Sequence, residues 1–254
     1  METVIKNRNN VDVTVVVEEP QNATDKLAFV MHGLGGSKDE VHLRGLISAL
    51  LNNGFRVVSW NAVHSFPERE EGLYEDATIT NYYQDMEDVI QWAAQRRWYA
   101  EPFLLCGHSL GGISTTLFTQ NYPERVSALA PISMVVSGKL SVALRSEQEI
   151  TSWKAAGVLV SKRRSGDEKR LKWSHMEDRL KYDALDKASV LEMPVFMAVG
   201  ENDTSTPPNH QQLFYDELPG KKELHVIAGA RHTFDEAYER QELERHFDHW
   251  LKTL

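Results

Sequence analysis

The segment Gly107-His108-Ser109-Leu110-Gly111 decides the fold of this chain. It follows an apolar run at residues 102–106, which predicts a strand, and it precedes a stretch at residues 112–122 that predicts a helix. The pattern Gly-x-Ser-x-Gly between a strand and a helix is typical of a nucleophile elbow, a strained turn that exposes the serine at the top of a sheet. Only small residues two positions before and after the serine let strand and helix approach so closely. We therefore predict that Ser109 is a nucleophile.

A glycine-rich turn, His32-Gly33-Leu34-Gly35-Gly36, follows the apolar run 27–31. Turns of this form supply oxyanion holes, in which preorganised backbone N–H groups stabilise the charge of a tetrahedral intermediate. The N–H groups of Leu34 and of Leu110, the residue after the predicted nucleophile, are our candidates. An ordinary strand-to-loop turn that needs glycine is the alternative. The glycines do not form a phosphate-binding motif, because neither Gly-x-x-x-x-Gly-Lys nor Gly-x-Gly-x-x-Gly is present.

An acid and a histidine follow two later strand-like segments. Asp203 comes shortly after the apolar run 195–199, and His232 comes after the strand-like segment 223–227, which contains Glu223 and His225. A carboxylate at a strand end can orient a histidine and stabilise its imidazolium form. A histidine, whose pKa lies near neutrality, can take a proton from a serine and return it. We predict that Asp203 and His232 complete a catalytic triad with Ser109.

Other assignments remain open for some of these residue types. Asp203 alternatively caps the helix expected near residue 208, and Glu201 and Asp235 are rival acids. The chain has ten histidines, of which we expect His32 and His108 to be structural. No His-Glu-x-x-His motif is present, so we predict no metal site, and the triad chemistry needs no cofactor.

The order Ser109, Asp203, His232 is that of α/β-hydrolases rather than of chymotrypsin-like or subtilisin-like enzymes. The sequence resembles the α/β-hydrolase superfamily over nearly its whole length. It is most similar to small bacterial or archaeal serine esterases of the cinnamoyl (feruloyl) esterase and monoacylglycerol-lipase-like kind. That resemblance implies a serine carboxylesterase that hydrolyses short-chain or aromatic, hydroxycinnamoyl-like esters through an acyl-enzyme. One departure is the loop 61–65, which lacks the glycines of the Gly-x-Gly-x-Ser loop usual in these relatives.

The same machinery serves other reactions, because the pocket and not the fold selects the substrate. A thioesterase, an amidase or peptidase, and a C–C hydrolase are therefore alternatives. A non-catalytic ligand-binding module is a further alternative, against which the intact serine, acid and histidine argue.

Apolar runs and helical patterns alternate along the chain, which predicts an α/β fold with a mainly parallel central sheet and helices on both faces. All four motifs lie at predicted strand ends, where the active sites of such sheets form. We expect strands at 11–17, 27–31, 55–60, 103–106, 126–132, 195–199 and 224–227. We expect helices at 38–53, 80–97, 109–122, 208–218 and 234–252.

Residues 133–190 break this alternation. We predict that they form a small inserted lid and that residues 1–132 and 191–254 form the hydrolase core. Within the lid we expect a helix at 144–155, a β-hairpin of 158–162 and 169–173 around residues 164–167, and a short helix at 175–182. The candidates to line a substrate pocket are Met134, Val135, Trp153 and Trp173. The alternative is that the tryptophans only anchor the lid.

The hairpin carries a basic cluster that could meet an anionic substrate or a membrane surface. A solvated hairpin is the favoured interpretation, because Asp167 and Glu168 interrupt the positive charge. The cluster consists of Lys162, Arg163, Arg164, Lys169, Arg170 and Lys172.

Length and composition agree with a single α/β domain. The chain has 254 residues and a net charge of -9, which disfavours nucleic acid as a partner. Its single cysteine, Cys106, cannot form an intrachain disulfide. No signal peptide and no apolar stretch of membrane-spanning length is present, so we expect a cytoplasmic protein without membrane insertion. The expected partner is a small-molecule ester, and a homodimer is left open.

Overall fold

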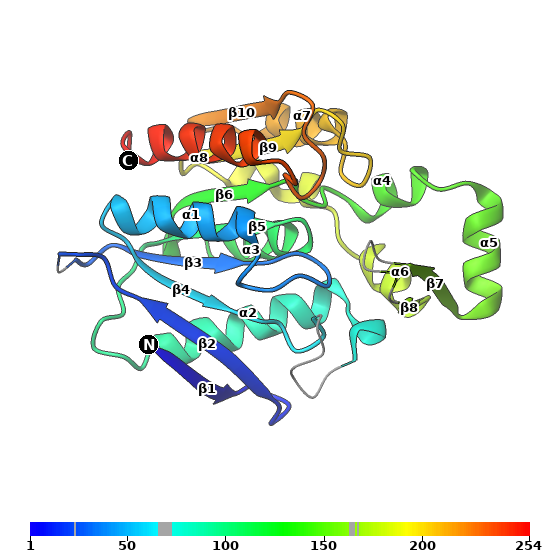
Figure 1. Cartoon of the computed structure of the whole chain (residues 1–254), viewed down its shortest axis with the longest axis horizontal. Coiled ribbons are helices and arrows are strands. Elements are labelled where there is room, and N and C mark those ends of the chain that lie inside the picture. The colour runs from blue at the N-terminus through cyan, green and yellow to red at the C-terminus, as the bar shows by residue number, and fades with distance from the viewer. Residues whose placement is uncertain (23, 66–72, 163–165, 167) are drawn as a thin grey trace.

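A central sheet of eight strands organises the molecule (Figure 1), in the computed structural model that describes residues 1–22, 24–65, 73–162, 166 and 168–254. The strand order is β1-β2-β4-β3-β5-β6-β9-β10. All neighbours from β4 to β10 are parallel, whereas β2 is antiparallel to both β1 and β4. The strands are β1 (Glu2–Lys6), β2 (Asp12–Glu18), β3 (Leu27–Met31), β4 (Arg56–Trp60), β5 (Phe103–His108), β6 (Val126–Ile132), β9 (Val195–Gly200) and β10 (Lys222–Ile227).

Helices cover both faces of the sheet, as the alternation of the sequence predicts (Figure 1). Helices α1 (Val41–Asn52) and α8 (Ala237–Leu251) pack on one face. Helices α2 (Ile79–Ala93), α3 (Leu110–Asn121) and α7 (Pro208–Glu217) pack on the other. The expected mainly parallel sheet with helices on both faces is therefore confirmed.

Strand β3 shows how the sheet separates two apolar cores. Its alternate residues Ala28 and Val30 join the core under α1 and α8, while Phe29 and Met31 join the core under α2 and α3. All five residues of β3 are buried, as expected for a strand with helices on both sides. This double burial explains why the strand appears in the sequence as a continuous apolar run.

The segment between β6 and β9, residues 133–190, is called the insert below. It contains α4 (Gly138–Ala143), α5 (Glu147–Ala156), the antiparallel pair β7 (Val158–Lys162) and β8 (Glu168–Lys172), α6 (Ser174–Arg179) and the 3-10 helix η3 (Ala184–Val190). The two-stranded sheet is separate from the central sheet. Of the expected hairpin turn at 164–167, residues 164, 165 and 167 lie outside the described residues, as does Arg163 of the basic cluster.

Ion pairs and hydrogen bonds fasten the insert to the segment before α2 and to the first turn of α2. Lys172 Nζ lies 2.6 Å from Asp76 Oδ1, and Arg170 Nε lies 3.3 Å from Glu75 Oε2. The carboxylate of Asp178 accepts hydrogen bonds from the backbone N–H and the hydroxyl of Thr80, at 2.9 and 2.6 Å. Arg170 and Lys172 of the basic cluster therefore have acidic partners within the molecule.

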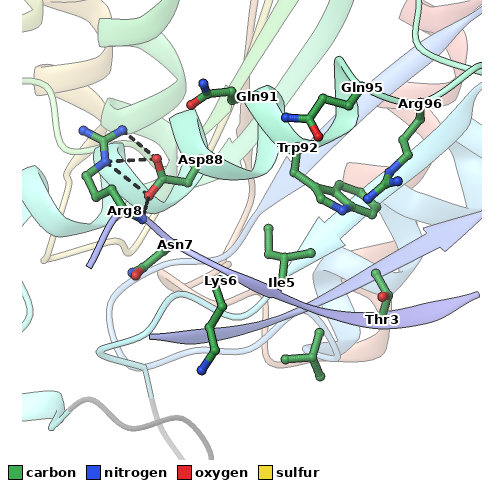
Figure 2. A pocket seen from close by; sticks show the side chains of 11 residues that line it. Thr3, Ile5, Lys6, Asn7, Arg8, Asp88, Gln91, Trp92, Gln95 and Arg96 are labelled. Carbon is green, nitrogen blue, oxygen red and sulfur yellow. Dashed lines mark hydrogen bonds and ion pairs between the residues drawn. The ribbon is translucent and has the colours of Figure 1, made fainter. Parts of the chain in front are cut away.

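A groove of about 500 Å³ lies between β1 and α2 (Figure 2). Arg8 of this groove forms hydrogen-bonded ion pairs with Asp88 and Glu87 of α2, and Lys6 forms an ion pair with Asp12. None of the predicted site residues lines this groove. Among the described residues, no helix combines the length and apolar character that crossing a bilayer requires.

Candidate active site

Ser109 lies between β5 and α3 with a positive φ of 55° and a ψ of -112°. A Cβ atom on Gly111 would lie 2.5 Å from the carbonyl oxygen of His32, and one on Gly107 would collide with the backbone of Gly111. Glycine is thus required at both positions, because the backbone of another segment lies where a side chain would begin. The N–H of Ser109 donates to the carbonyl of Ile132 at 2.9 Å, which ties the turn to the end of β6.

The fold brings the three predicted triad residues together. Ser109 Oγ lies 2.9 Å from His232 Nε2, and His232 Nδ1 lies 2.8 Å from Asp203 Oδ2. Asp203 follows β9, and His232 follows β10, so each residue comes from the carboxyl end of a parallel strand. The carboxylate of Asp203 is fully buried, whereas the side chain of His232 remains 24% exposed. The chain of contacts can move a proton from the serine to the imidazole while the carboxylate orients the ring.

Asp203 is held by the residues that follow it. Its Oδ1 accepts the backbone N–H groups of Ser205 and Thr206 at 2.8 and 2.9 Å, and Thr206 Oγ1 lies 2.8 Å from its Oδ2. Burial by itself would raise the pKa of Asp203. The hydrogen bonds from His232 and Thr206 outweigh burial and lower that pKa, so the carboxylate stays ionised.

The two rival acids are engaged elsewhere. Glu201 Oε2 accepts the N–H of Gly229 at 2.8 Å, and Asp235 Oδ1 accepts the hydroxyl of Thr233 at 2.7 Å. Neither makes a described contact with the imidazole of His232, whose Nδ1 faces Asp203 and Thr206.

His32 and Tyr82 support the glycine turn. The N–H of Ala62 donates to His32 Nε2 at 2.9 Å, so Nδ1 carries the ring proton and donates to the carbonyl of Gly33 at 2.7 Å. Complete burial lowers the pKa of His32 to about 4, which keeps this ring neutral. The hydroxyl of Tyr82 lies within hydrogen-bond distance of the turn, 3.3 Å from the N–H of Gly35. These contacts fix the backbone on both sides of Leu34.

The loop 61–65, which lacks the glycines usual in the resembling esterases, is also held in place. Asp85 Oδ2 accepts the N–H of Val63 at 2.9 Å, and Asn61 Oδ1 accepts the N–H of Lys38 at 2.9 Å. Buried side chains thus replace glycine as the means of shaping this loop.

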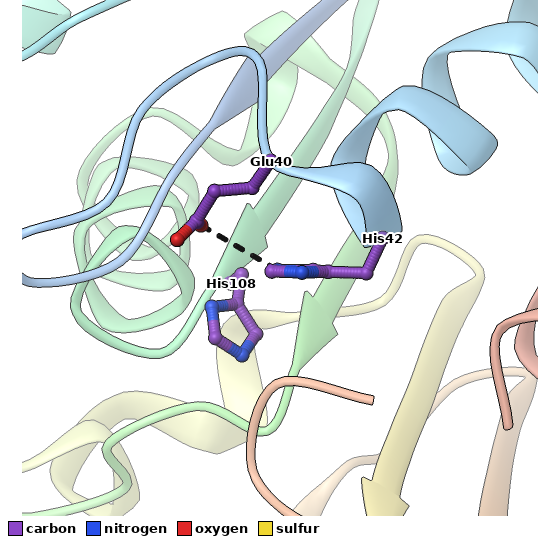
Figure 3. A group of neighbouring side chains, drawn as sticks. All are labelled: Glu40, His42 and His108. Carbon is purple, nitrogen blue, oxygen red and sulfur yellow. Dashed lines mark ion pairs between the residues drawn. The ribbon is translucent and has the colours of Figure 1, made fainter. Parts of the chain in front are cut away.

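His108, in the elbow, holds the backbone of His232, the predicted catalytic histidine, through a hydrogen bond. Its Nε2 donates to the carbonyl of His232 at 2.8 Å, which leaves Nδ1 as a buried lone pair with no hydrogen-bond partner among the described residues. His42 Nε2 is likewise buried without a hydrogen-bond partner there and lies 3.7 Å from Glu40 Oε2 (Figure 3). Among the described residues, Glu40, His42 and His108 are the group that could hold a metal ion, with ligand atoms within 4.8 Å of one another. No sequence motif marks this group.

A cavity of about 480 Å³ opens above Ser109, between the strand ends and the insert. Val135 and Trp153, two of the predicted pocket residues, line it. Met134 and Trp173 do not line it. Met134 packs against α3, where its sulfur lies 3.5 Å from Thr116 Oγ1, and Trp173 packs edge-on against the far side of Trp153.

The cavity is also lined by residues that the sequence analysis did not select for the substrate pocket, among them Leu34, which it selected for the oxyanion hole. From the core these are Leu34, Tyr74, Ser205 and Thr206. From the insert they are Arg145, Glu149, Leu159, Ser161, Lys169, Leu171, His175, Met176 and Arg179. The Asp-x-x-Thr spacing after β9 could have indicated Thr206, because threonine at that spacing can hydrogen-bond the aspartate. Of the insert residues, Lys169 belongs to the basic cluster that the sequence analysis considered for an anionic substrate, and the others carry no comparable signal.

The parallel sheet, the elbow at the end of β5 and the acid and histidine after β9 and β10 define an α/β-hydrolase. Over residues 22–182, more than half of its length, the chain matches the family described as serine aminopeptidase, S33. The chain belongs to this hydrolase family. The expected membership of the α/β-hydrolase superfamily is thereby confirmed.

Solved structures share the fold at low sequence identity. A structure of Est1E from Butyrivibrio proteoclasticus with ferulic acid bound has a TM-score of 0.85 and 18% identity, covering 99% of this chain and 98% of that chain. Mouse alpha/beta hydrolase domain-containing protein 10 has a TM-score of 0.80 and 14% identity, covering 100% and 99%. A monoacylglycerol lipase from Paleococcus ferrophilus has a TM-score of 0.72 and 18% identity, covering 94% and 98%. At these identities the likeness concerns the fold.

Proposed function

We propose that this protein is a serine carboxylesterase that hydrolyses short-chain or aromatic, hydroxycinnamoyl-like esters through an acyl-enzyme. The observation that carries the proposal is the contact chain from Ser109 Oγ through His232 to Asp203 at the floor of the cavity. The cavity volume lies within the range of small-molecule sites. The structural likeness to a protein that binds ferulic acid supports an aromatic acyl group.

In the first step His232 Nε2 takes the proton of Ser109 as Oγ attacks the ester carbonyl. Nδ1–H donates to Asp203, which keeps the ring in the required tautomer and stabilises the imidazolium. His232 then returns the proton to the leaving alcohol, and the acyl-enzyme forms. Water, activated by the same histidine, resolves it.

The N–H groups of Leu34 and Leu110 form the oxyanion hole in this proposal. Leu110 begins α3, so its N–H has no partner within the helix, and neither N–H has an acceptor among the described residues. The positive end of the α3 dipole adds to the stabilisation of an oxyanion at this position.

The family description makes an aminopeptidase the second candidate. An aminopeptidase must bind the positively charged amino terminus of its substrate, usually with a carboxylate. Glu149 is the one acidic residue among the described lining, and its Oε2 already accepts the N–H and hydroxyl of Ser146. The cations that share the lining would repel an ammonium group, which favours the esterase.

A panel of 4-nitrophenyl esters from acetate to palmitate, with methyl ferulate and leucine 4-nitroanilide, tests the proposal. We expect turnover of short or aromatic esters, and a loss in kcat of at least about 10³-fold in Ser109→Ala. Turnover of the anilide alone would favour the aminopeptidase. Failure of wild-type Ser109 to react with a fluorophosphonate, with no turnover of any substrate, would leave a ligand-binding module as the better description.

A further inference from the structure

Two arginines of the insert, Arg145 and Arg179, line the same cavity as Ser109 without a carboxylate partner among the described residues. The Nε atom of Arg179 is buried and makes no hydrogen bond there. The guanidinium of Arg145 lies over the ring of Trp153, 5.2 Å from its centroid. Both residues are half-buried, but the Nε atom of Arg179 is withdrawn from water, and a guanidinium nitrogen that loses water without gaining a partner destabilises the fold.

The surroundings of Arg179 oppose its charge. Loss of water and, to a smaller extent, the positive charge of Arg145 together lower the pKa of Arg179 to about 10. Two neighbouring like charges in a cavity destabilise the ligand-free protein. An anion between them would relieve both the repulsion and the missing hydrogen bonds.

The other charged residues of the cavity do not remove this imbalance. Lys169 is a third cation of the lining, and its Nζ lies over the ring of Tyr74 at 5.3 Å. Glu149, the one acid of the described lining, feels the charge of Arg145, but its carboxylate is held by the hydrogen bonds of Ser146 that cap α5. The cations Arg170 and Lys172 of the same hairpin lie outside this cavity and have acidic partners.

We infer that Arg145 and Arg179 form an anion-binding subsite, so that the substrate is an ester carrying a carboxylate or phosphate group away from the reacting carbonyl. The inference rests on the proposed esterase function, whose nucleophile shares the cavity with this subsite. Arginine suits the role because its planar donors match the oxygens of carboxylate and phosphate. The anion lies on the acyl part or on the alcohol part of the ester, and the experiment separates these cases.

The kinetic test uses isosteric pairs of esters. For the acyl part, mono-(4-nitrophenyl) glutarate is compared with 4-nitrophenyl 5-methylhexanoate. For the alcohol part, the butyrate ester of 4-hydroxybenzoic acid is compared with that of its amide. We expect a preference in kcat/KM of about 10- to 100-fold for the anionic member of one pair, as hydrogen bonds to charged groups provide.

Matched variants assign the preference to the arginines. Arg145→Met and Arg179→Met should each remove most of the preference, with kcat/KM falling far more for the anionic ester than for its neutral partner, because only the anion loses its hydrogen-bond donors. Arg170→Met is the control, since it removes the same charge from the hairpin outside the cavity. An equal loss in all three variants would indicate long-range attraction and overturn the subsite.

A thermal-unfolding measurement tests anion binding at the subsite independently of ester turnover. Glutarate should raise the Tm of the wild type, glutaramide should not, and Arg179→Met should abolish the glutarate effect. Without glutarate, Arg179→Met should unfold at the same or a higher temperature, because it removes a half-buried charge whose Nε atom makes no hydrogen bond among the described residues. Ser109-dependent turnover with no anionic preference and no glutarate effect would overturn the subsite and leave the esterase standing. A glutarate effect without turnover of any ester would support the subsite and overturn the esterase function.

Discussion

Thr206 shows how the candidate triad depends on a residue outside it. Its Oγ1 lies 2.8 Å from Asp203 Oδ2, 2.9 Å from the carbonyl of Ser133 and 3.2 Å from His232 Nδ1. The hydroxyl therefore connects the carboxylate, the imidazole and the start of the insert. A side chain of this kind positions the reacting groups without touching the substrate's carbonyl.

Replacement of Thr206 by valine keeps the shape of the side chain and removes the hydroxyl. We expect kcat to fall about tenfold with little change in KM, because the charged carboxylate loses one hydrogen bond and orients His232 less firmly. Thr206→Ser should retain most of the activity. The measurement is steady-state kinetics on the best ester of the panel, and a Thr206→Val enzyme with wild-type kcat would contradict the positioning role.

At the scale of residues, the sequence predicts the site residues that follow strands. It does not predict the site residues that the insert brings together. Ser109, Asp203 and His232 could be selected because each lies just past a predicted strand, and the fold brings them within hydrogen-bond distance. Arg145 and Arg179 could not be selected, because they lie 34 positions apart and meet only through the path of the insert. Side-chain convergence of that kind has no local signature.

At the scale of elements, the crossing of β5 and α3 at the elbow leaves no room for a side chain. The backbone of Gly111 lies against the carbonyls of Met31 and His32 at the end of β3. The elbow is thus wedged between two neighbouring strands of the sheet, which explains how the positive φ of Ser109 is maintained.

Gly111→Ala should therefore separate α3 from the sheet. We expect a loss of more than about 3 kcal/mol in the free energy of unfolding, because a Cβ at 2.5 Å from a backbone oxygen cannot be relieved by a side-chain rotation. Gly54→Asn is the control, since Gly54 has a φ of 83° with open space around it, and asparagine tolerates that conformation. Urea unfolding of both variants measures the difference, and equal midpoints would contradict the crowding argument.

The strength of the local pattern explains which elements the sequence predicts. The expected strands 27–31 and 126–132 coincide with β3, which is buried and apolar throughout, and with β6, in which Ser127 is the one exposed residue. Strand β1 was not expected, because four of its five residues are not buried and its edge position depends on pairing with β2. Helix α4, of six residues, is too short for a periodic pattern.

At the scale of the whole molecule, several histidines are buried in the neutral form. Burial lowers the pKa of His32 to about 4 and the pKa values of His42 and His175 to about 3, and it lowers the pKa of His108 well below its ordinary value. These rings lie in the glycine turn, α1, α6 and the elbow, so their protonation acts on the whole fold rather than on one region.

Stability should therefore fall as the pH falls below about 6.5, the pKa of histidine in an unfolded chain. Below that pH the unfolded chain binds protons that the folded protein excludes, so each such histidine removes about 1.4 kcal/mol per pH unit until its folded pKa is reached. Urea unfolding at pH 7.5, 6.0 and 5.0 measures the effect in a window above the ordinary carboxyl pKa values. An unfolding free energy that is constant over this window would contradict the neutral burial of these rings.

The insert enters and leaves the core through a single narrow stem. Ser137 and Asp183 form an antiparallel bridge, and the N–H of Gly138 donates to the carbonyl of Tyr182 at 3.0 Å. Because the two ends already meet, residues 139–181 form a closed excursion that a short turn could replace at little cost in loop-closure entropy. An insert with a different pocket lining could be exchanged at this point, provided that it replaces the contacts with Glu75, Asp76 and Thr80, while Ser109 and His232 stay at the strand ends.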